Sequence, residues 1–339
     1  MQKRLGVVIL LAALLSGNWT PRISAADPLP VLATTSIIAD VAQNVGGDFV
    51  QVTALIPVNS DPHSYYPTPR DLVLVSAAAI VLVNGIGLEE NLLDVVTEYA
   101  SVEPVVVSLG APVLSILYPA EVGAADSPNE SPSPYLGELG LDVTCEPAEI
   151  NAEHGHAPCD PHIWTNPANV ILWVANIAEA FAAADPDHAE IYAANAAAYT
   201  AELAALDAEI AALVEPLAVE KRVLVTSHTF LSYFAVAYNF EVVGSILPGV
   251  GASAEVSARD LIDLIDLVQE RGIPVIFGEV SQNNELAETV AAEAGDTVTV
   301  ILLYSGSLSE ADGEAGNYLD YMRYNTLLIV AALGETNLP

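Results

Sequence analysis

The stretch AEIYAANAAAYTAELAALDAEIAALV, from Ala189 to Val214, is rich in alanine and contains neither glycine nor proline. Alanine has the highest intrinsic helix propensity, so this run is a strong helix former. As a single α-helix it would span roughly 40 Å, because each residue adds 1.5 Å along the axis. Its apolar spacing suits docking against other elements rather than a coiled coil. We therefore predict one long, rigid linking helix within residues 185–217, with His188 near its start as a capping or surface residue.

The sequence on both sides of this helix alternates short β-rich runs with helical stretches. The runs predicted as strands are PVLATTS, FVQVTALIP, AIVLVNG and PVVVSLG before the helix, and KRVLVTS, FEVVGSILP, IPVIFGE and DTVTVILLY after it. Strands that alternate with helices predict a parallel sheet covered by helices. The predicted fold class is α/β: two lobes, 27–184 and 218–339, each a parallel-sheet sandwich, joined by the long helix. Ligands of such folds bind at the carboxyl ends of the strands, which places the expected site in the interlobe cleft.

Residues 118–158 interrupt the first lobe with a segment rich in Pro, Ser, Glu and Gly, which predicts a long, acidic surface loop. His154 and His156 in this loop have two interpretations, transient metal capture or no specific role. The only cysteines are Cys145 and Cys159. In an oxidising compartment we expect them to form a disulfide, and the alternative is ligation of a metal by the Cys159 thiolate.

The first 26 residues have the pattern of an export signal. Lys3 and Arg4 precede an apolar stretch, and the small residues from Ser24 to Ala26 provide a cleavage site after Ala26. The apolar stretch is too short to span a membrane, and we expect no later stretch to be long and apolar enough. Asn18 stands where a lipoprotein signal would carry its lipid-bearing cysteine. We therefore expect a soluble, exported protein that is periplasmic or extracellular.

The charge of the chain is strongly negative, with nine basic and 44 acidic residues and a formal net charge of −35. Such a surface repels nucleic acid and anionic lipid, so neither is an expected partner. It also raises the concentration of cations close to the surface, while dissolved salt screens the attraction at longer distances. The alternative interpretation is that the charge serves only solubility.

Two segments, DPHSYYPTP (61–69) and CDPHIWTNP (159–167), repeat Asp-Pro-His followed by an aromatic residue and a proline. Proline restricts the backbone around each histidine, and a metal ligand benefits from such stiffness. The repeats contain His63 and His162, while His228 and Glu279 each follow a predicted strand of the second lobe. Three imidazoles and a carboxylate suit Zn²⁺ and are acceptable to Mn²⁺. Four protein ligands would leave no place for a reactive water, which favours carriage of the ion over hydrolysis.

The segments DPHSYYPTPRDL, DPHIWTNPANV, VTSHTFLSYFAVAYNF and YLDYMRYN resemble those of the zinc- and manganese-binding solute receptors of ABC-type metal uptake systems. The similarity runs from about Pro30 to the C-terminus, with residues 118–158 as the variable part. It implies two lobes joined by a rigid helix, with the metal held between them and delivered to a membrane permease. It also implies that His63, His162 and His228 are the histidine ligands.

The fourth ligand is less clear from this resemblance, because many members have an aspartate where this chain has Gly306. Glu279 stands where the family also has a glutamate and is the first candidate. Water, Glu310 or Asp312 are the alternatives. With three histidines and an open fourth position, zinc is favoured over manganese, which prefers more oxygen ligands.

Several points stay open. Asp61 and Asp160 have three possible roles: to orient or cap the nearby backbone, or to accept hydrogen bonds from ligands. Tyr65, Tyr66 and Trp164 either wall the cleft or belong to the core. We expect the protein to act as a monomer and to bind metal more weakly at low pH, where histidine is protonated.

Two other functions compete with metal carriage. A His₃ site with a water ligand would resemble a zinc-dependent hydrolase with Glu279 as general base, although no His-Glu-x-x-His motif is present. A receptor for an organic solute or a metal chelate would need a roomier cleft with arginines or more aromatic residues.

Overall fold

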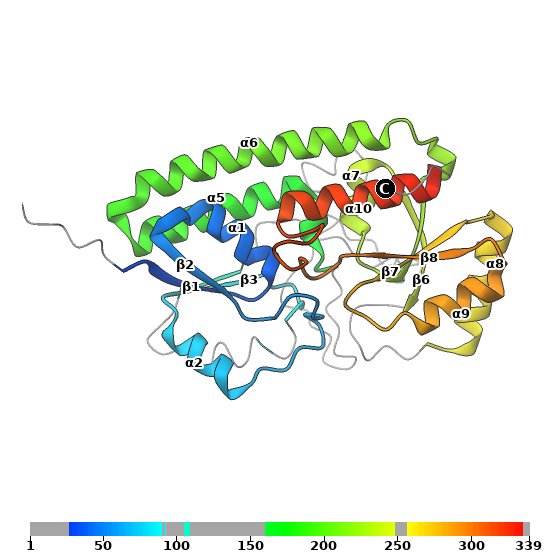
Figure 1. The fold of residues 1–339 in the computed structure, drawn as a ribbon, viewed down its shortest axis with the longest axis horizontal. Coiled ribbons are helices and arrows are strands. Elements are labelled where there is room, and N and C mark those ends of the chain that lie inside the picture. Colours follow the sequence, from blue (N-terminus) through cyan, green and yellow to red (C-terminus); the bar gives the residue numbers. More distant parts are fainter. Residues whose placement is uncertain (1–26, 90–91, 93–104, 109–159, 248–255, 335–339) are drawn as a thin grey trace, which may run out of the picture.

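The computed structural model describes residues 27–89, 92, 105–108, 160–247 and 256–334, which form two parallel sheets with helices packed around them (Figure 1). The first sheet has the order β2-β1-β3-β4, with β1 (Leu29–Ala33), β2 (Val50–Ala54), β3 (Ile80–Val83) and β4 (Val105–Ser108). The second has the order β6-β5-β7-β8, with β5 (Val223–His228), β6 (Glu241–Leu247), β7 (Val275–Glu279) and β8 (Thr299–Leu303). All pairings are parallel, which confirms the predicted α/β class.

The helices follow the predicted alternation. They are α1 (Ser36–Gly46), α2 (Pro69–Ala77), α5 (Pro167–Ala184), α6 (Ala189–Val214), α7 (Ser232–Tyr238), α8 (Ala258–Arg271), α9 (Glu285–Ala294) and α10 (Tyr318–Gly334). The export signal, the loop at 118–158 and both cysteines lie outside the described residues, so the disulfide stays a prediction. The lobe boundaries also stay a prediction.

Short polar residues determine where several helices begin. The side chain of Thr35 accepts a hydrogen bond from the backbone nitrogen of Ile38 at the start of α1. At the start of α5, the side chain of Asn166 accepts from the backbone nitrogen of Ala168, and Pro167 occupies the first turn. These side chains satisfy backbone donors that have no partner within the helix.

The two sheets have the same strand order. In each, the second strand lies on one side of the first strand, and the third and fourth strands lie on its other side. Such an order has a switch point between the first and third strands, where a crevice forms at their carboxyl ends. In the second sheet these strands are β5 and β7. His228 is the last residue of β5 and Glu279 is the last residue of β7, so both lie at the switch point.

Helix α6 begins and ends at the residues predicted from the sequence and lies along both sheets (Figure 1). It contacts α1 and α5 on one side of the molecule and α10 on the other. One stripe of the helix is buried, as expected for docking: Tyr192, Tyr199, Leu203, Leu206, Ile210 and Val214. Its role as a rigid connector between the lobes stays a prediction.

One expectation about hydropathy was wrong. Helix α5 is long and apolar enough to cross a membrane by length and composition, although the sequence was expected to contain no such stretch after the signal. A helix of the protein core can have the same composition, because alanine and valine are suited to a protein core as well as to a membrane. Helix α5 buries Val170, Trp173, Ile177 and Phe181 and packs against α1 and α6. We therefore assign it to the core.

Substitutions on α6 test whether its buried stripe holds the fold together. Ile210 is fully buried, whereas Ile191 on the same helix is 36% exposed. We expect Ile210→Ala to lower the free energy of unfolding by about 2–5 kcal/mol, because it removes buried methylene groups and leaves a cavity. Ile191→Ala is the matched control and should cost less than half as much in urea unfolding. Equal losses would contradict docking through this stripe.

Candidate metal centre

His63 is presented by the loop that follows β2. The Oδ1 atom of Asp61 accepts a hydrogen bond from the backbone nitrogen of His63 at 3.0 Å, across the intervening Pro62. An aspartate that bonds the backbone two residues further on stabilises a tight turn, and proline fixes one of its dihedral angles. The imidazole of His63 is buried. The first Asp-Pro-His segment therefore forms a stiff turn that places this ring inside the protein.

His162 is presented by the second Asp-Pro-His segment in the same way. Oδ1 of Asp160 accepts from the backbone nitrogen of His162 at 2.9 Å. The same oxygen also accepts from the Nδ1 atom of the imidazole at 2.7 Å. The two aspartates thus share a backbone role, and Asp160 additionally orients its histidine.

His228 comes from the other lobe, at the end of β5. Its Nδ1 atom lies against Oε1 of Glu279, at the end of the neighbouring strand β7. The hydroxyl of Ser227 donates to the same carboxylate oxygen. Both His228 and Glu279 are buried. The carboxylate of Glu279 therefore supports the ring of His228 from its Nδ1 side, as the carboxylate of Asp160 supports the ring of His162.

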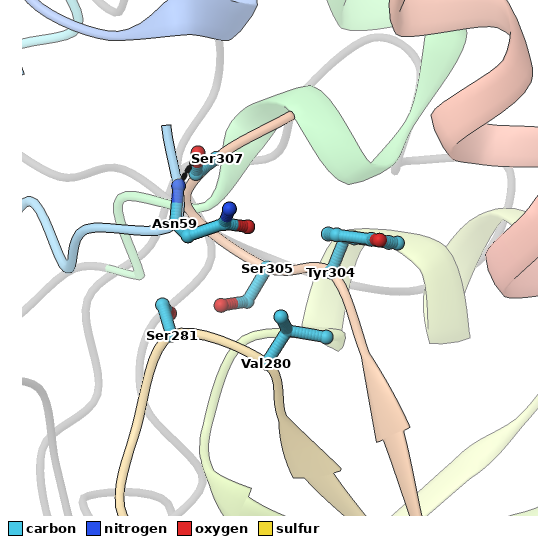
Figure 2. Close-up of a pocket in the computed structure, with 6 residues that line it drawn as sticks. All are labelled: Asn59, Val280, Ser281, Tyr304, Ser305 and Ser307. Atoms are coloured by element: carbon cyan, nitrogen blue, oxygen red, sulfur yellow. Dashed lines mark hydrogen bonds between the residues drawn. The ribbon is translucent and has the colours of Figure 1, made fainter. Parts of the chain in front are cut away.

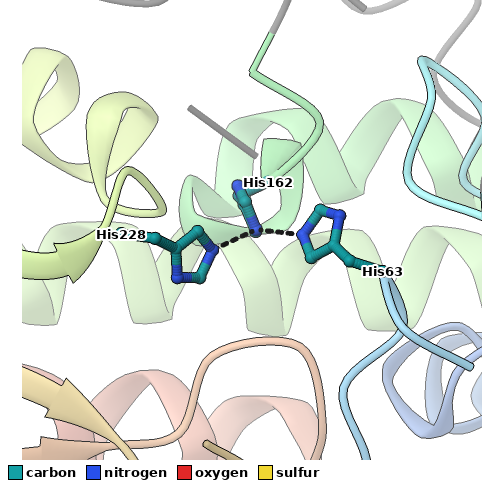
Figure 3. A group of neighbouring side chains, drawn as sticks. All are labelled: His63, His162 and His228. Atoms are coloured by element: carbon teal, nitrogen blue, oxygen red, sulfur yellow. Dashed lines mark hydrogen bonds between the residues drawn. The ribbon is translucent and has the colours of Figure 1, made fainter. Parts of the chain in front are cut away.

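The three rings converge through their Nε2 atoms (Figure 3). The Nε2 atom of His162 lies 3.1 Å from that of His63 and 3.1 Å from that of His228. Ligand atoms of all three residues lie within 4.8 Å of one another. The structure thus brings together the three histidines that the sequence predicted as ligands.

The hydrogen bonds at Nδ1 determine which ring nitrogen carries the proton. Because Asp160 and Glu279 accept, Nδ1 of His162 and of His228 donates, and each neutral ring has its lone pair on Nε2. When both rings are neutral, the two Nε2 lone pairs face each other at 3.1 Å and repel, whereas a proton on His228 lets its Nε2 atom donate to that of His162. A cation between the rings replaces this repulsion by coordination. The arrangement is therefore suited to hold a metal ion.

Glu279, predicted as the fourth ligand, is not a member of this group in the described part of the chain. Its Oε1 atom is engaged by His228 and Ser227, behind the ring rather than where the Nε2 atoms meet. Its role as a direct ligand stays a prediction. The alternative acids Glu310 and Asp312 are exposed and also lie outside the group, while Cys159, His154 and His156 lie outside the described residues.

Burial and charge act differently on two of the three histidines. Burial lowers the pKa of His63 well below its usual value, and the neighbouring His162 and His228 lower it further. Burial also lowers the pKa of His228, but the carboxylate of Glu279 more than offsets this, so its pKa is raised. Burial raises the pKa of Glu279, whereas the charge and hydrogen bond of His228 bring it below the usual value. His228 is therefore the histidine that competes with a metal through its proton.

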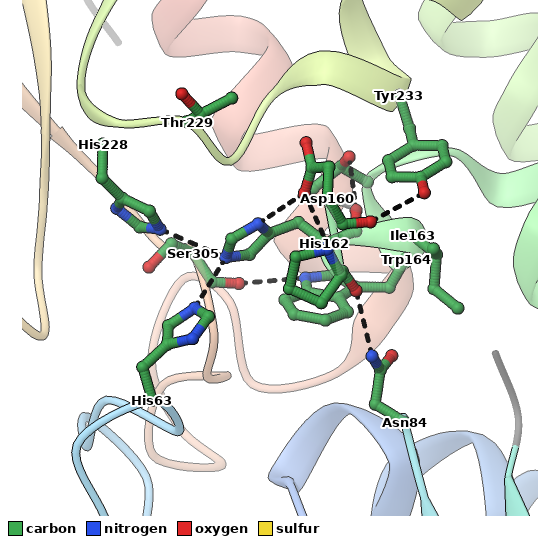
Figure 4. Close-up of polar contacts among 12 residues, drawn as sticks. His63, Asn84, Asp160, His162, Ile163, Trp164, His228, Thr229, Tyr233 and Ser305 are labelled. Atoms are coloured by element: carbon green, nitrogen blue, oxygen red, sulfur yellow. Dashed lines mark hydrogen bonds and ion pairs between the residues drawn. The ribbon is translucent and has the colours of Figure 1, made fainter. Parts of the chain in front are cut away.

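Residues that the sequence reasoning missed hold the His162 turn from both lobes (Figure 4). The side-chain nitrogen of Asn84, just after β3, donates to the carbonyl of Pro161 at 3.0 Å. The hydroxyl of Tyr233, in α7 of the second lobe, donates to the carbonyl of Asp160 at 2.7 Å. The position of Asn84 at a strand end was a usable signal, whereas nothing in the sequence identifies Tyr233.

The aromatic residues near the two turns have different roles. Trp164 is buried, its ring centroid lies 5.3 Å from that of His162, and its Nε1 atom donates to the carbonyl of Ser305 at 3.0 Å. Tyr65 donates to Asp71 at the start of α2. Tyr66 is 72% exposed. Of the three, Trp164 packs against a histidine of the centre.

A small pocket lies where the loops after β7 and β8 meet the loop after β2 (Figure 2). It is lined by Asn59, Val280, Ser281, Tyr304, Ser305 and Ser307. The backbone nitrogen of Asn59 donates to Oγ of Ser307 at 2.8 Å across the two lobes. Val280 directly follows Glu279, so this polar pocket borders the supports of the centre.

Fold and site together define a class, the two-lobed α/β binding proteins with a buried metal centre. Residues 31–332 match the family described as "Zinc-uptake complex component A periplasmic" (ZnuA). The chain belongs to this family, which confirms the resemblance read from its motifs. It is accordingly a metal-binding, substrate-binding protein of an ABC transporter.

Several relatives are similar to this chain over almost its whole length. The manganese-binding lipoprotein MntA of Bacillus subtilis (strain 168) is 31% identical over 314 residues, which cover 91% of each chain. The iron-binding protein YfeA of Yersinia pestis is 30% identical over 310 residues, covering 91% of this chain and 88% of YfeA. These names point to different metals, so they leave the ion open.

Solved structures show the same fold. The periplasmic zinc binding protein TroA from Treponema pallidum has a TM-score of 0.72 and 27% identity, covering 90% of this chain and 99% of TroA. A Mn-bound periplasmic metal binding protein from Candidatus Liberibacter asiaticus has a TM-score of 0.69 and 26% identity, with the same coverage.

The contact between Glu279 and His228 predicts how pH affects metal binding. A proton competes with the metal below the pKa of His228, which Glu279 raises. In Glu279→Gln the neutral amide no longer offsets burial, so this pKa falls and the pH of half-maximal binding should move lower. Metal affinity above that range should also fall by about 10–100-fold, as is typical when a carboxylate behind a histidine ligand is lost.

Metal titrations between about pH 5 and 8 measure both effects, since histidine titrates in this range. The exposed Glu288 on α9 provides the control variant Glu288→Gln, which should match the unmodified protein. An unchanged or higher pH of half-maximal binding in Glu279→Gln would contradict the assigned contact.

Proposed function

We propose that this chain is an extracytoplasmic, high-affinity receptor for a divalent metal that delivers the ion to an ABC permease, with Zn²⁺ as its principal cargo and Mn²⁺ as the alternative. The observation that carries the proposal is the convergence of three buried Nε2 atoms, two of them with carboxylates behind their rings. His63, His162 and His228 are the proposed ligands. Membership of the family supports transfer to a permease.

The choice of zinc rests on the donor set and its spacing. At a Zn–N distance of about 2.05 Å, a separation of 3.1 Å between two nitrogens corresponds to an angle of about 98°. Opening this to a tetrahedral angle needs ring movements of only a few tenths of an ångström. The group of three contains no oxygen, and manganese prefers more oxygen ligands. We propose a fourth ligand from solvent, with the other carboxylate oxygen of Glu279 as the alternative.

The two competing functions have less support. A zinc-dependent hydrolase would need Glu279 as a free general base, yet its Oε1 atom is engaged by His228 and Ser227. The relatives are named as metal-binding proteins. The pocket that borders the centre in the described residues is lined by Asn59, Val280, Ser281, Tyr304, Ser305 and Ser307, and so contains no arginine to bind an anionic organic solute.

Titration of the metal-stripped mature protein with Zn²⁺ and with Mn²⁺ tests the proposal. We expect one tight zinc site and weaker manganese binding. His228→Ala should weaken zinc binding by more than about 100-fold, because loss of a ligand exceeds the 10–100-fold typical of a supporting residue. His188→Ala is the control, since His188 pairs with Asp185 outside the group. Tight binding that survives His228→Ala would refute the proposed site.

Location is the second part of the proposal. Relatives carry the name lipoprotein, whereas residue 18 of this chain is an asparagine without a thiol. We infer export without a lipid at this position. In a bacterial expression host the full-length chain should appear in the soluble extracytoplasmic fraction, and Asn18→Cys should move part of it to the membrane with a lipid-sized gain in mass. Asn18→Ser is the control, and lipid on the unmodified chain would contradict the inference.

A further inference from the structure

The segment Ser305–Leu308, which follows β8, touches the supports of all three histidines. The carbonyl of Ser305 accepts from Nε1 of Trp164, two residues after His162. The side chain of Ser305 also faces the carboxylate of Glu279, the acceptor of His228, and helps to lower its pKa. These contacts connect the segment to two of the three rings.

The same segment is held by the first lobe. The backbone nitrogen of Leu308 donates to Oγ of Ser36 at 2.9 Å, at the start of α1. Oγ of Ser307 accepts from the backbone nitrogen of Asn59 at 2.8 Å (Figure 2). Asn59 lies four residues before His63, so these bonds draw the segment against the loop that presents the third ring.

Gly306 lies directly against Pro62 of that loop. A Cβ atom on Gly306 would lie 2.6 Å from Cδ and 2.8 Å from Cγ of Pro62. Both distances are shorter than carbon atoms tolerate. Gly306 is not among the described glycines with a positive φ, so the position requires space and not an unusual backbone conformation.

Pro62 cannot absorb such a contact by rotating away. Its Cδ atom is bonded to the backbone nitrogen, so a displaced ring displaces the chain. The next residue is His63, whose Nε2 atom lies 3.1 Å from that of His162. Metal–ligand distances are reproducible within about 0.2 Å, so a small shift of His63 matters to a bound ion.

We propose that Gly306 is a positioning residue of the metal centre: its missing side chain lets Ser305–Leu308 pack against Pro62, and this contact sets the place of His63 relative to His162 and His228. The inference rests on the proposed function, because it assumes that these three histidines bind the ion. It assigns a role to a residue that has no side chain to offer as a ligand.

The variant Gly306→Ala tests this, with zinc affinity measured by competition with a chelator and stability measured by urea unfolding of the metal-free protein. Affinity should fall by about 10–100-fold, the range for supporting residues of a metal site. Gly244→Ala, in β6, is the control, because its Cβ would meet only the flexible ends of Leu264 at 2.7 Å and Leu267 at 3.6 Å. This control should change stability alone. Gly306→Ala with the zinc affinity of the unmodified protein would overturn the inference.

A rescue experiment separates positioning from general damage. In the double variant Pro62→Ala/Gly306→Ala the ring that collides with the new Cβ is gone, so zinc should bind more tightly than in Gly306→Ala alone. Residues in contact show such non-additive effects, whereas independent ones do not. The absorption spectrum of bound Co²⁺ should change in Gly306→Ala and return towards that of the unmodified protein in the double variant.

The outcomes distinguish the two proposals. If the unmodified protein binds neither Zn²⁺ nor Mn²⁺, the proposed function fails and the inference fails with it. If the unmodified protein binds zinc and the effects of Pro62→Ala and Gly306→Ala are strictly additive, the function stands and the positioning role of Gly306 is refuted.

Discussion

The structure depends on three imidazole nitrogens that face one another in a buried space. Without a metal ion or a proton between the rings this arrangement is unfavourable, because the lone pairs of neutral His162 and His228 repel at 3.1 Å and both rings are removed from water. It persists because each ring is constrained from behind. Carboxylates hold Nδ1 of two rings, and the Asp-Pro-His turns hold the backbone of His63 and His162. The energy that maintains this geometry comes from the surrounding fold, which makes the site ready for an ion before the ion arrives.

The fold supplies these constraints through the ends of its strands and the loops between them. Parallel sheets bring the carboxyl ends of neighbouring strands together, so His228 and Glu279 meet although 51 residues separate them. The turn that carries His162 is not part of a sheet, and it is held by Asn84 from one lobe and Tyr233 from the other. The centre is therefore a property of the assembled lobes and not of either one alone.

The sequence predicted those features that depend on local patterns. Hydrophobic periodicity and alanine content located α6 from Ala189 to Val214, and the Asp-Pro-His repeats together with a strand end located the three histidines. Contacts between distant segments could not be predicted in this way. Whether Glu279 faces an ion or the Nδ1 side of His228 depends on the register between β5 and β7. The spacing of residues along the sequence does not reveal this register. The packing of Gly306 on Pro62 depends on how the lobes meet, and hydropathy alone could not tell the core helix α5 from a membrane span.

The charges around the centre explain why a divalent ion suits it. A buried charge is costly unless an opposite charge lies close to it. The carboxylates of Asp160 and Glu279 stand one ring away from the point where the Nε2 atoms meet, so a doubly charged ion at that point would be balanced by two negative charges. Below the pKa of His228, which Glu279 raises, a proton on this ring supplies part of this balance when no ion is bound. Capture of the ion is then an exchange of a proton for a metal, and the strongly acidic surface favours the approach of either cation.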